Sequence, residues 1–215
     1  MTAPIYMETG ARRVIAGAIE WPGWARSGKG EGATIEALFA YGPRYAKALP
    51  RRLGFTVPAR RSELRVKERL EGDATTDFGA PSIAPAADGR RLPEAELVRQ
   101  TAILRAAWEA LGAAAQAAEG AELRKGPRGG GRELDAIVSH VLESDRAYLG
   151  RLWAGLRLPS DDADLLHAAI LESLRSRARG EPAPASRGKV WSPRYFVRRS
   201  AWHALDHTWE IEDRA

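Results

Sequence analysis

The spacing of apolar residues changes near residue 80, and this change constrains the fold of the chain more than any other feature. Before it, short β-like runs and turn signals surround one helical stretch. From residue 93 onward, apolar residues recur at intervals of three and four, as on one face of a helix. The sequence therefore predicts an α+β chain of two domains, a small mixed domain followed by an all-α domain.

The first expected domain covers residues 1–72 and has the order β-β-α-β. The run from Val14 to Ile19 predicts a strand, and the turn residues Trp21 to Trp24, with Pro and Gly between them, end it. Alternation of side-chain type between Leu64 and Arg69 predicts the last strand, half-buried or at a sheet edge. A further strand between the first strand and the helix completes the expected order.

The helix of this domain is expected to begin at Thr34, whose side chain suits an N-cap, and to extend to Leu49. Pro43 lies inside this pattern and predicts a kink or a split. Residues 73–92 are punctuated by Gly and Pro and carry few large apolar side chains. They are therefore expected to form a linker.

Residues 93–215 are expected to form four helices. Pro93 followed by acidic residues suits one helix start, and Ser192 followed by Pro193 suits another as N-cap and first-turn proline. The connections favour an up-down four-helix bundle, with a long crossover as the open alternative. The expected helices cover residues 93–118, 132–155, 163–179 and 193–215.

The chain contains no cysteine and four histidines. The lack of cysteine excludes a disulfide scaffold, a Cys-ligated zinc finger, an iron–sulfur site and a Cys nucleophile. Transition-metal chemistry would therefore have to use histidines and carboxylates. All four histidines lie in the last 76 residues, at His140, His167, His203 and His207.

Three of these histidines form a candidate metal site. His203 and His207 are four residues apart on the last expected helix, so their side chains share a face and can bind one ion. His140 is expected to face them, because a bundle builds metal sites from side chains on facing helices. Three histidines without a fourth protein ligand would leave an open coordination position, as in catalytic sites. Alternatively, His140 is a hydrogen-bonded core residue and the other two form an exposed pair.

Carboxylates near these histidines are the candidates for catalytic or orienting roles. Asp206 and Glu210 follow His203 and His207 at helical spacing, and Glu210 is also a candidate fourth ligand. Solvated or salt-bridged helix charges are the plain alternative for both. His167 has no second histidine at a ligand spacing and is expected to be an ordinary, partly buried residue.

Two segments carry a recognisable pattern: the stretch from Gly131 to Asp145, which contains His140, and the stretch from Arg198 to Glu210, which contains His203 and His207. With them, residues 93–215 resemble the DinB/YfiT-like superfamily of four-helix-bundle metalloproteins. The resemblance implies that the three histidines bind a divalent ion, with Zn, Ni, Mn and Fe all open. It also implies a metal-dependent transferase or hydrolase that uses a low-molecular-weight thiol as cosubstrate.

Two other segments, from Ala16 to Ala25 and from Gly32 to Leu38, resemble HicB-like domains, which are small, partial RNase H-like β-β-α-β units. This resemblance implies a fold only. An antitoxin role would need a separate DNA-binding segment, and a nuclease would need clustered carboxylates; the sequence indicates neither.

The net charge of +5 lies entirely in residues 1–92, which hold 15 basic and 10 acidic side chains. Arg65, Lys67 and Arg69 would form a basic stripe on one face of a strand, a feature typical of phosphate binding. A solvated strand edge that discourages aggregation is the favoured interpretation, and a nucleic-acid-associated regulator is the weakest of the functional alternatives.

Targeting signals are missing from the sequence as it stands. No apolar stretch approaches the ~20 residues that span a bilayer, and the first residues lack the layout of a signal peptide. A cytoplasmic protein without a membrane partner is therefore expected. A small-molecule substrate is the expected partner, and a homodimer is one open oligomeric state.

The leading hypothesis is thus a DinB-like enzyme with a three-histidine metal site. The main alternative is a non-enzymatic module in which the metal stabilises a binding or interaction surface.

Overall fold

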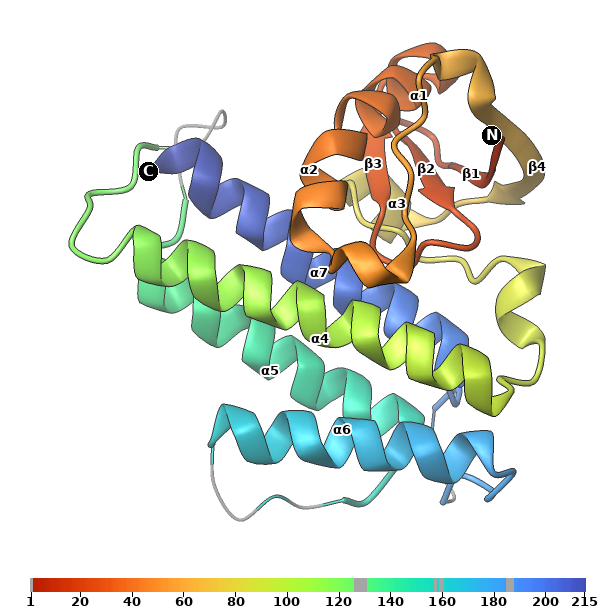
Figure 1. The fold of residues 1–215 in the computed structure, drawn as a ribbon, viewed down its shortest axis with the longest axis vertical. Helices are drawn as coiled ribbons and strands as arrows, with labels where there is room; N and C mark the ends of the chain where they lie inside the picture. The colour runs from red at the N-terminus through yellow and green to blue at the C-terminus, as the bar shows by residue number, and fades with distance from the viewer. Residues whose placement is uncertain (1, 126–130, 157, 159–160, 185–187) are drawn as a thin grey trace. The chain divides into compact units, whose positions relative to one another are not determined.

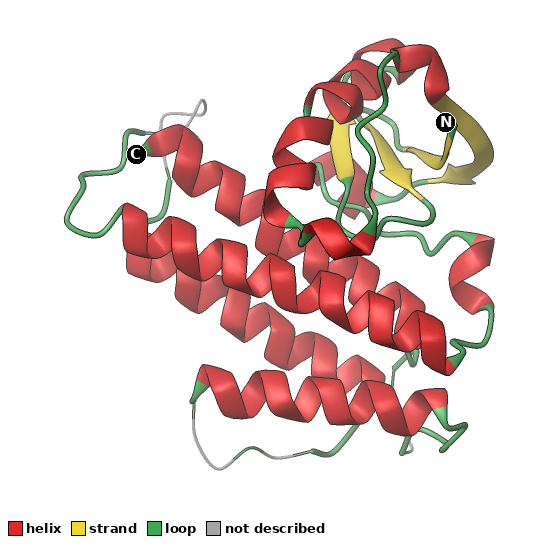
Figure 2. Ribbon diagram, viewed as in Figure 1, coloured by secondary structure: helices red, strands yellow, loops and turns green. Residues whose placement is uncertain are grey.

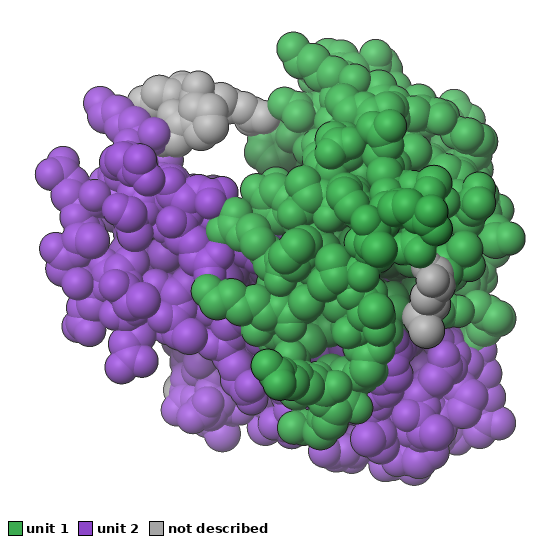
Figure 3. Space-filling model, turned by 45° about the horizontal axis from the view of Figure 1, so that its top comes forward, with its two compact units in different colours: residues 1–90 green, residues 91–215 purple. Residues whose placement is uncertain are grey.

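The computed structural model describes residues 2–125, 131–156, 158, 161–184 and 188–215. It divides into two compact units, Met1–Arg90 and Arg91–Ala215 (Figure 3). Within the described residues, all strands belong to the first unit, and the second unit is built from helices (Figure 2). The expected α+β class is therefore confirmed, with strands before residue 90 and long helices after it.

The first unit contains a mixed four-stranded sheet with the order β3-β2-β1-β4. Strand β1 pairs antiparallel with β2 and parallel with β4, and β2 pairs antiparallel with β3. The strands are β1 (Ala3–Thr9), β2 (Val14–Ala18), β3 (Ala25–Gly28) and β4 (Leu64–Glu71).

Strand β1 was not predicted from the sequence, although it is a central strand of the sheet. Ile5, Tyr6 and Met7 are consecutive and fully buried, so the strand lacks the alternation of apolar and polar residues that marks a half-buried strand. Strand β4, in contrast, was predicted because Arg65, Lys67 and Arg69 are exposed along it while the residues between them are not. Arg69 forms an ion pair with Glu31, which neutralises part of the basic stripe within the unit.

The helical stretch of the first unit splits as predicted near Pro43. The two parts are α1 (Glu31–Ala40) and α2 (Gly42–Ala48), with Pro43 in the first turn of α2. The expected N-cap is wrong: α1 begins at Glu31 and is capped by Gly30, whose φ of 83° favours glycine. Thr34 is instead buried inside α1, and its hydroxyl donates to the carbonyl of Gly30 at 2.7 Å.

The segment expected as a linker carries structure of its own. It contains α3 (Ala74–Phe78) and a short 3₁₀ helix (Ala86–Gly89), and the contacts that define the first unit extend to Arg90. The segment is held by Glu8, a fully buried carboxylate on β1 that accepts hydrogen bonds from the Thr76 hydroxyl and from the backbone N–H groups of Ser82 and Ile83. A buried carboxylate needs such donors, so this segment completes the unit.

Four helices are described in the second unit, close to the predicted ranges. Ser192 accepts from the backbone N–H of Tyr195 and Pro193 occupies the first turn, so the predicted start of the last helix is confirmed. Asp162 likewise caps the third helix. The helices are α4 (Glu94–Ala117), α5 (Leu134–Leu152), α6 (Ala163–Ala178) and α7 (Pro193–Arg214).

Contacts at the helix ends show that α4 and α7 run in the same direction. Near their N-termini, Arg194 of α7 forms an ion pair with Glu96 of α4. At the other end, the backbone N–H of Arg124, beyond α4, donates to the carbonyl of Arg214 at 2.9 Å. Helix α5 is antiparallel to α7, because the end of α5 meets the residues before α7 through Trp191 N–H and the Arg151 carbonyl at 2.9 Å.

Helix α6 runs alongside α5 in the same direction (Figure 1). His167, in the first turns of α6, stacks on Trp108 in the C-terminal half of α4. The expectation of strictly alternating helix directions is therefore wrong, and the order is up-down-down-up, the long-crossover alternative. The ten residues between α5 and α6 have the reach for this, since a fully extended segment of that length spans up to about 33 Å and the 16-residue α6 is about 24 Å long.

None of the described helices is both long enough and apolar enough to cross a membrane.

Candidate metal centre

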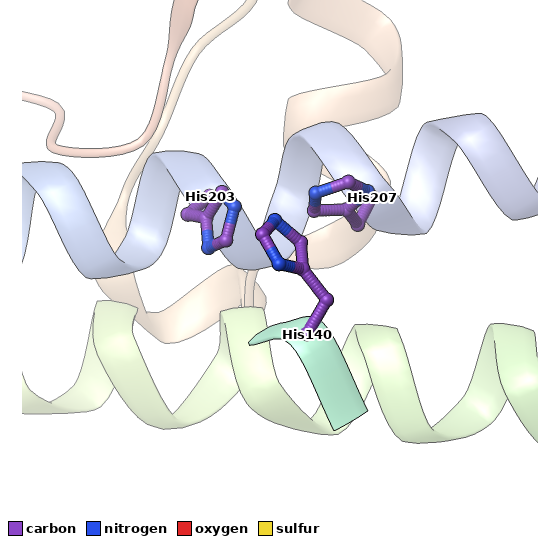
Figure 4. A group of neighbouring side chains, drawn as sticks. All are labelled: His140, His203 and His207. Atoms are coloured by element: carbon purple, nitrogen blue, oxygen red, sulfur yellow. The ribbon is translucent and has the colours of Figure 1, made fainter. Parts of the chain in front are cut away.

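Three histidines from two helices converge in the second unit. His140 projects from α5 toward His203 and His207, which lie one turn apart on α7 (Figure 4). One nitrogen of each ring lies within 4.8 Å of the others. The ring centroids are 4.7 Å apart for His203 and His207, and 5.0 and 5.2 Å apart for the pairs that include His140.

This spacing is close enough to hold a metal ion. Nitrogens bound to a tetrahedral zinc ion at about 2.0–2.1 Å are about 3.3 Å apart, so the three rings would have to move closer together around an ion. The expected convergence of His140, His203 and His207 is therefore present. His140 is therefore not a core residue separate from the other two, as the alternative had it.

The environment of two of the rings keeps them neutral, as metal ligands must be. Burial is the main cause that lowers the pKa of His203 to about 2, and the neighbouring His207 and Arg199 side chains contribute to the same shift. Burial also lowers the pKa of His140, with Arg132 as the next cause. Among the described residues, no hydrogen-bond partner meets the buried Nδ1 atom of His203. An orphaned buried nitrogen of this kind suits a site that is completed by a ligand.

His207 is oriented by a carboxylate. Its Nδ1–H donates to Oε2 of Glu210 at 2.7 Å. This hydrogen bond is the largest cause of the lowered pKa of Glu210, so the side chain is an ionised carboxylate and can only accept. The hydrogen bond therefore requires a proton on Nδ1 of His207, so Nε2 is the nitrogen that would bind an ion. Metal-binding histidines in proteins have this second partner as a rule.

Glu210 is in turn held by Arg214, a buried residue at the end of α7. Nη1 of Arg214 donates to Oε1 of Glu210 at 2.8 Å and to the carbonyl of Arg132 at 2.9 Å. Its Nε donates to the carbonyl of Arg124 at 2.8 Å. The end of the last helix is thereby tied to the residues that precede α5, which fixes the carboxylate beside His207.

The two carboxylates singled out from the sequence differ in their position. Glu210 is engaged with His207 and Arg214, which fits an orienting role rather than that of a fourth ligand. Within the described part of the chain, the group of side chains close enough to share an ion consists of the three histidines and includes neither Glu210 nor Asp206. Asp206 is half-buried on α7 and lies outside this group.

Loss of the orienting carboxylate should weaken metal binding without abolishing it. Glu210→Gln is expected to lower zinc affinity about 10- to 100-fold, because His207 loses a charged acceptor that fixes its tautomer. Competition with a chromophoric chelator measures the dissociation constant. Glu212→Gln, an exposed position on the same helix, is the matched control and should bind zinc as the wild type does. Equal affinity of both variants would contradict the orienting role of Glu210.

An arginine and two aromatic residues lie beside the histidines. The Tyr148 ring of α5 is 6.1 Å from the His203 ring, and its hydroxyl accepts a hydrogen bond from Nη2 of Arg199 at 3.1 Å. The Arg199 guanidinium lies 5.0 Å from the Trp202 ring and 5.5 Å from the Tyr148 ring. Arg199 was not predicted from the sequence, although its position four residues before His203 places it on the same face of α7.

A buried carboxylate links three helices of the unit. Asp145 of α5 is fully buried, and it accepts hydrogen bonds from Nε1 of Trp108 at 2.8 Å and from the hydroxyl of Ser200 at 2.5 Å. Burial outweighs these bonds and raises the pKa of Asp145 from 3.8 to about 6. The burial of Asp145 was not predicted from the sequence, because an aspartate within a helix is usually exposed.

His167 stays apart from the centre. Its ring stacks on Trp108 with centroids 3.7 Å apart and planes 7° apart. Burial lowers its pKa to about 4. The residue is therefore a neutral packing histidine, as expected from the sequence. Trp209 and Trp202 of α7 are also buried.

Comparison of the chain with family models, with curated proteins and with solved structures returned no match.

Proposed function

We propose that residues 91–215 form a DinB-like metalloprotein unit that binds a divalent ion through His140, His203 and His207. The observation that carries this proposal is the convergence of three imidazoles from two helices, with their nitrogens within 4.8 Å of one another. The buried, unpartnered nitrogen of His203 and the carboxylate that orients His207 support it.

The donor set favours an open site over a closed structural one. Structural zinc sites usually have four protein ligands, whereas catalytic sites keep three and leave a position for water or substrate. A divalent ion held by three imidazoles lowers the pKa of a sulfur or oxygen ligand, which makes that ligand nucleophilic at neutral pH. We therefore propose a metal-dependent transferase or hydrolase that acts on a small molecule.

Different residues of the chain have different roles in the proposed function. The three histidines hold the ion, and Glu210 keeps the proton of His207 on the nitrogen that faces away from it. Tyr148 and Arg199 present a hydroxyl and a guanidinium next to the centre. Because the chain contains no cysteine, a thiol nucleophile would come from a low-molecular-weight cosubstrate.

Transfer of a thiol to an electrophile tests the enzymatic proposal. Zinc-loaded protein is incubated with a panel of low-molecular-weight thiols and with 1-chloro-2,4-dinitrobenzene, and thioether formation is followed by absorbance; ester substrates test hydrolysis in parallel. Wild-type protein is expected to accelerate one of these reactions, and His203→Ala to remove the acceleration. His167→Phe is the matched control, because it removes an imidazole outside the centre while keeping a ring against Trp108.

One result would replace this function by the non-enzymatic alternative. If the wild type holds stoichiometric metal but accelerates neither thiol transfer nor hydrolysis, the second unit is a metal-stabilised binding module.

A further inference from the structure

Arg199 is a buried cation with unused hydrogen-bonding capacity. The residue is 9% exposed, and Nη2 donates to the Tyr148 hydroxyl. In the described part of the chain, Nη1 is buried and has no hydrogen-bond partner. The guanidinium also lies over the rings of Tyr148 and Trp202. Buried charges are normally paired, so an arginine in this state has the properties of a binding residue awaiting an anion.

The position of Arg199 indicates that an anion bound to it would lie beside the three histidines. It precedes His203 by four residues on α7, so the two side chains lie one turn apart on one face. Its partner Tyr148 lies beside the His203 ring, 6.1 Å between centroids. Both Tyr148 and His140 of α5 are partly exposed, so the group is not fully closed off from solvent.

We propose that Arg199 and Tyr148 form a carboxylate-binding subsite one helical turn from the metal centre, and that the small molecule bound there carries a carboxylate a few bonds from its metal-binding atom. This inference rests on the proposed function and specifies the class of its ligand. It follows from the free Nη1 donor, from the adjacent hydroxyl and from the distance to His203.

The chemistry of the two side chains selects a carboxylate. A guanidinium offers a planar fork of N–H donors that matches the two oxygens of a carboxylate. The Tyr148 hydroxyl accepts from Arg199, which leaves its own proton free to be donated to the anion. A phosphate dianion would bring more negative charge than this one guanidinium neutralises.

Two thiols that differ in one group test the subsite. Isothermal titration calorimetry measures the binding of 3-mercaptopropionate and of the neutral 3-mercaptopropan-1-ol to zinc-loaded and to metal-free protein, with the zinc content determined on the same samples. Wild-type protein is expected to bind the acid at least about tenfold more tightly than the alcohol, the size of one charge-assisted hydrogen bond. Arg199→Gln should bring this ratio close to one.

Two further variants separate the subsite from general charge effects. Arg199→Lys keeps the positive charge but not the planar fork, so it should retain only part of the preference for the acid. Arg146→Gln removes the same charge from a partly exposed position on α5, where Arg146 pairs with Asp161 at 3.1 Å. This control should keep the wild-type ratio. Circular dichroism verifies that each variant is folded. If Arg199→Gln does not fold, the comparison of Arg199→Lys with the wild type decides the test.

The outcomes distinguish this inference from the function on which it rests. If wild-type protein takes up zinc but binds the acid and the alcohol equally, the subsite is refuted and the metal centre stands. If wild-type protein takes up no zinc, the proposed function fails. The metal-free titrations then decide the subsite by themselves: a preference for the acid that Arg199→Gln removes supports it, and equal binding refutes it.

Discussion

Zinc at 1,000 times its dissociation constant is expected to raise the free energy of unfolding of the wild-type protein by about 4 kcal/mol. The reason is mass action: a ligand that binds the folded state alone stabilises it, and the centre joins His140 of α5 to His203 and His207 of α7. Urea denaturation with and without zinc measures the effect. Tryptophan fluorescence reports mainly on the second unit, which holds five of the seven tryptophans.

His203→Ala is expected to lose this gain in unfolding free energy. Only the imidazoles of His140 and His207 remain in the variant, and two ligands bind an ion much more weakly than three. His167→Phe should keep it, since His167 lies outside the centre and packs on Trp108. Zinc stabilisation that survives in His203→Ala would show that the ion binds elsewhere.

The second large effect concerns the buried carboxylate of Asp145. Between pH 7 and pH 4, the wild type is expected to gain about 2 kcal/mol in stability relative to Asp145→Asn. Burial raises the pKa of Asp145 from 3.8 to about 6 in the folded protein. The folded state therefore binds the proton more tightly than the unfolded chain does. The stabilisation is complete below the unfolded-state pKa and is lost as the pH rises through 6.

Urea denaturation of metal-free protein at a series of pH values checks this prediction. Asparagine keeps the shape of the side chain and an acceptor for Nε1 of Trp108, and its amide can donate to the hydroxyl of Ser200. The difference between wild type and variant therefore isolates the ionisation. Asp135→Asn, an exposed position on the same helix, is the control and should show no comparable step. A flat difference for Asp145→Asn would mean that Asp145 is solvated.

Local sequence patterns predicted most of the helices, but little of how the helices are directed and packed against one another. The three- and four-residue spacing and the Ser192-Pro193 start located α7 to within a residue, because capping and periodicity are local properties. The direction of α6 was not predictable in this way, because the choice between a short turn and a crossover depends on packing partners far away in the sequence. Strand β1 was also not predicted, because it is buried on both faces and therefore lacks the alternation of apolar and polar residues.

The convergence of the three histidines was predicted better than the residues that surround them. The spacing of His203 and His207 places both on one helical face, whatever the rest of the fold does. His140 needed the added assumption that the second and last helices face each other, and the structure has that arrangement. Arg199 and Tyr148 meet only through the register of α5 against α7, which a single sequence does not reveal.

Metal analysis of untagged protein tests the central claim most directly. Wild-type and His207→Ala proteins are purified without chelator, equilibrated with a slight excess of zinc, desalted and examined by inductively coupled plasma mass spectrometry. The account predicts close to one divalent ion per wild-type chain and a large loss in His207→Ala. A wild type without stoichiometric divalent metal, or a His207→Ala variant that holds as much as the wild type, would contradict it.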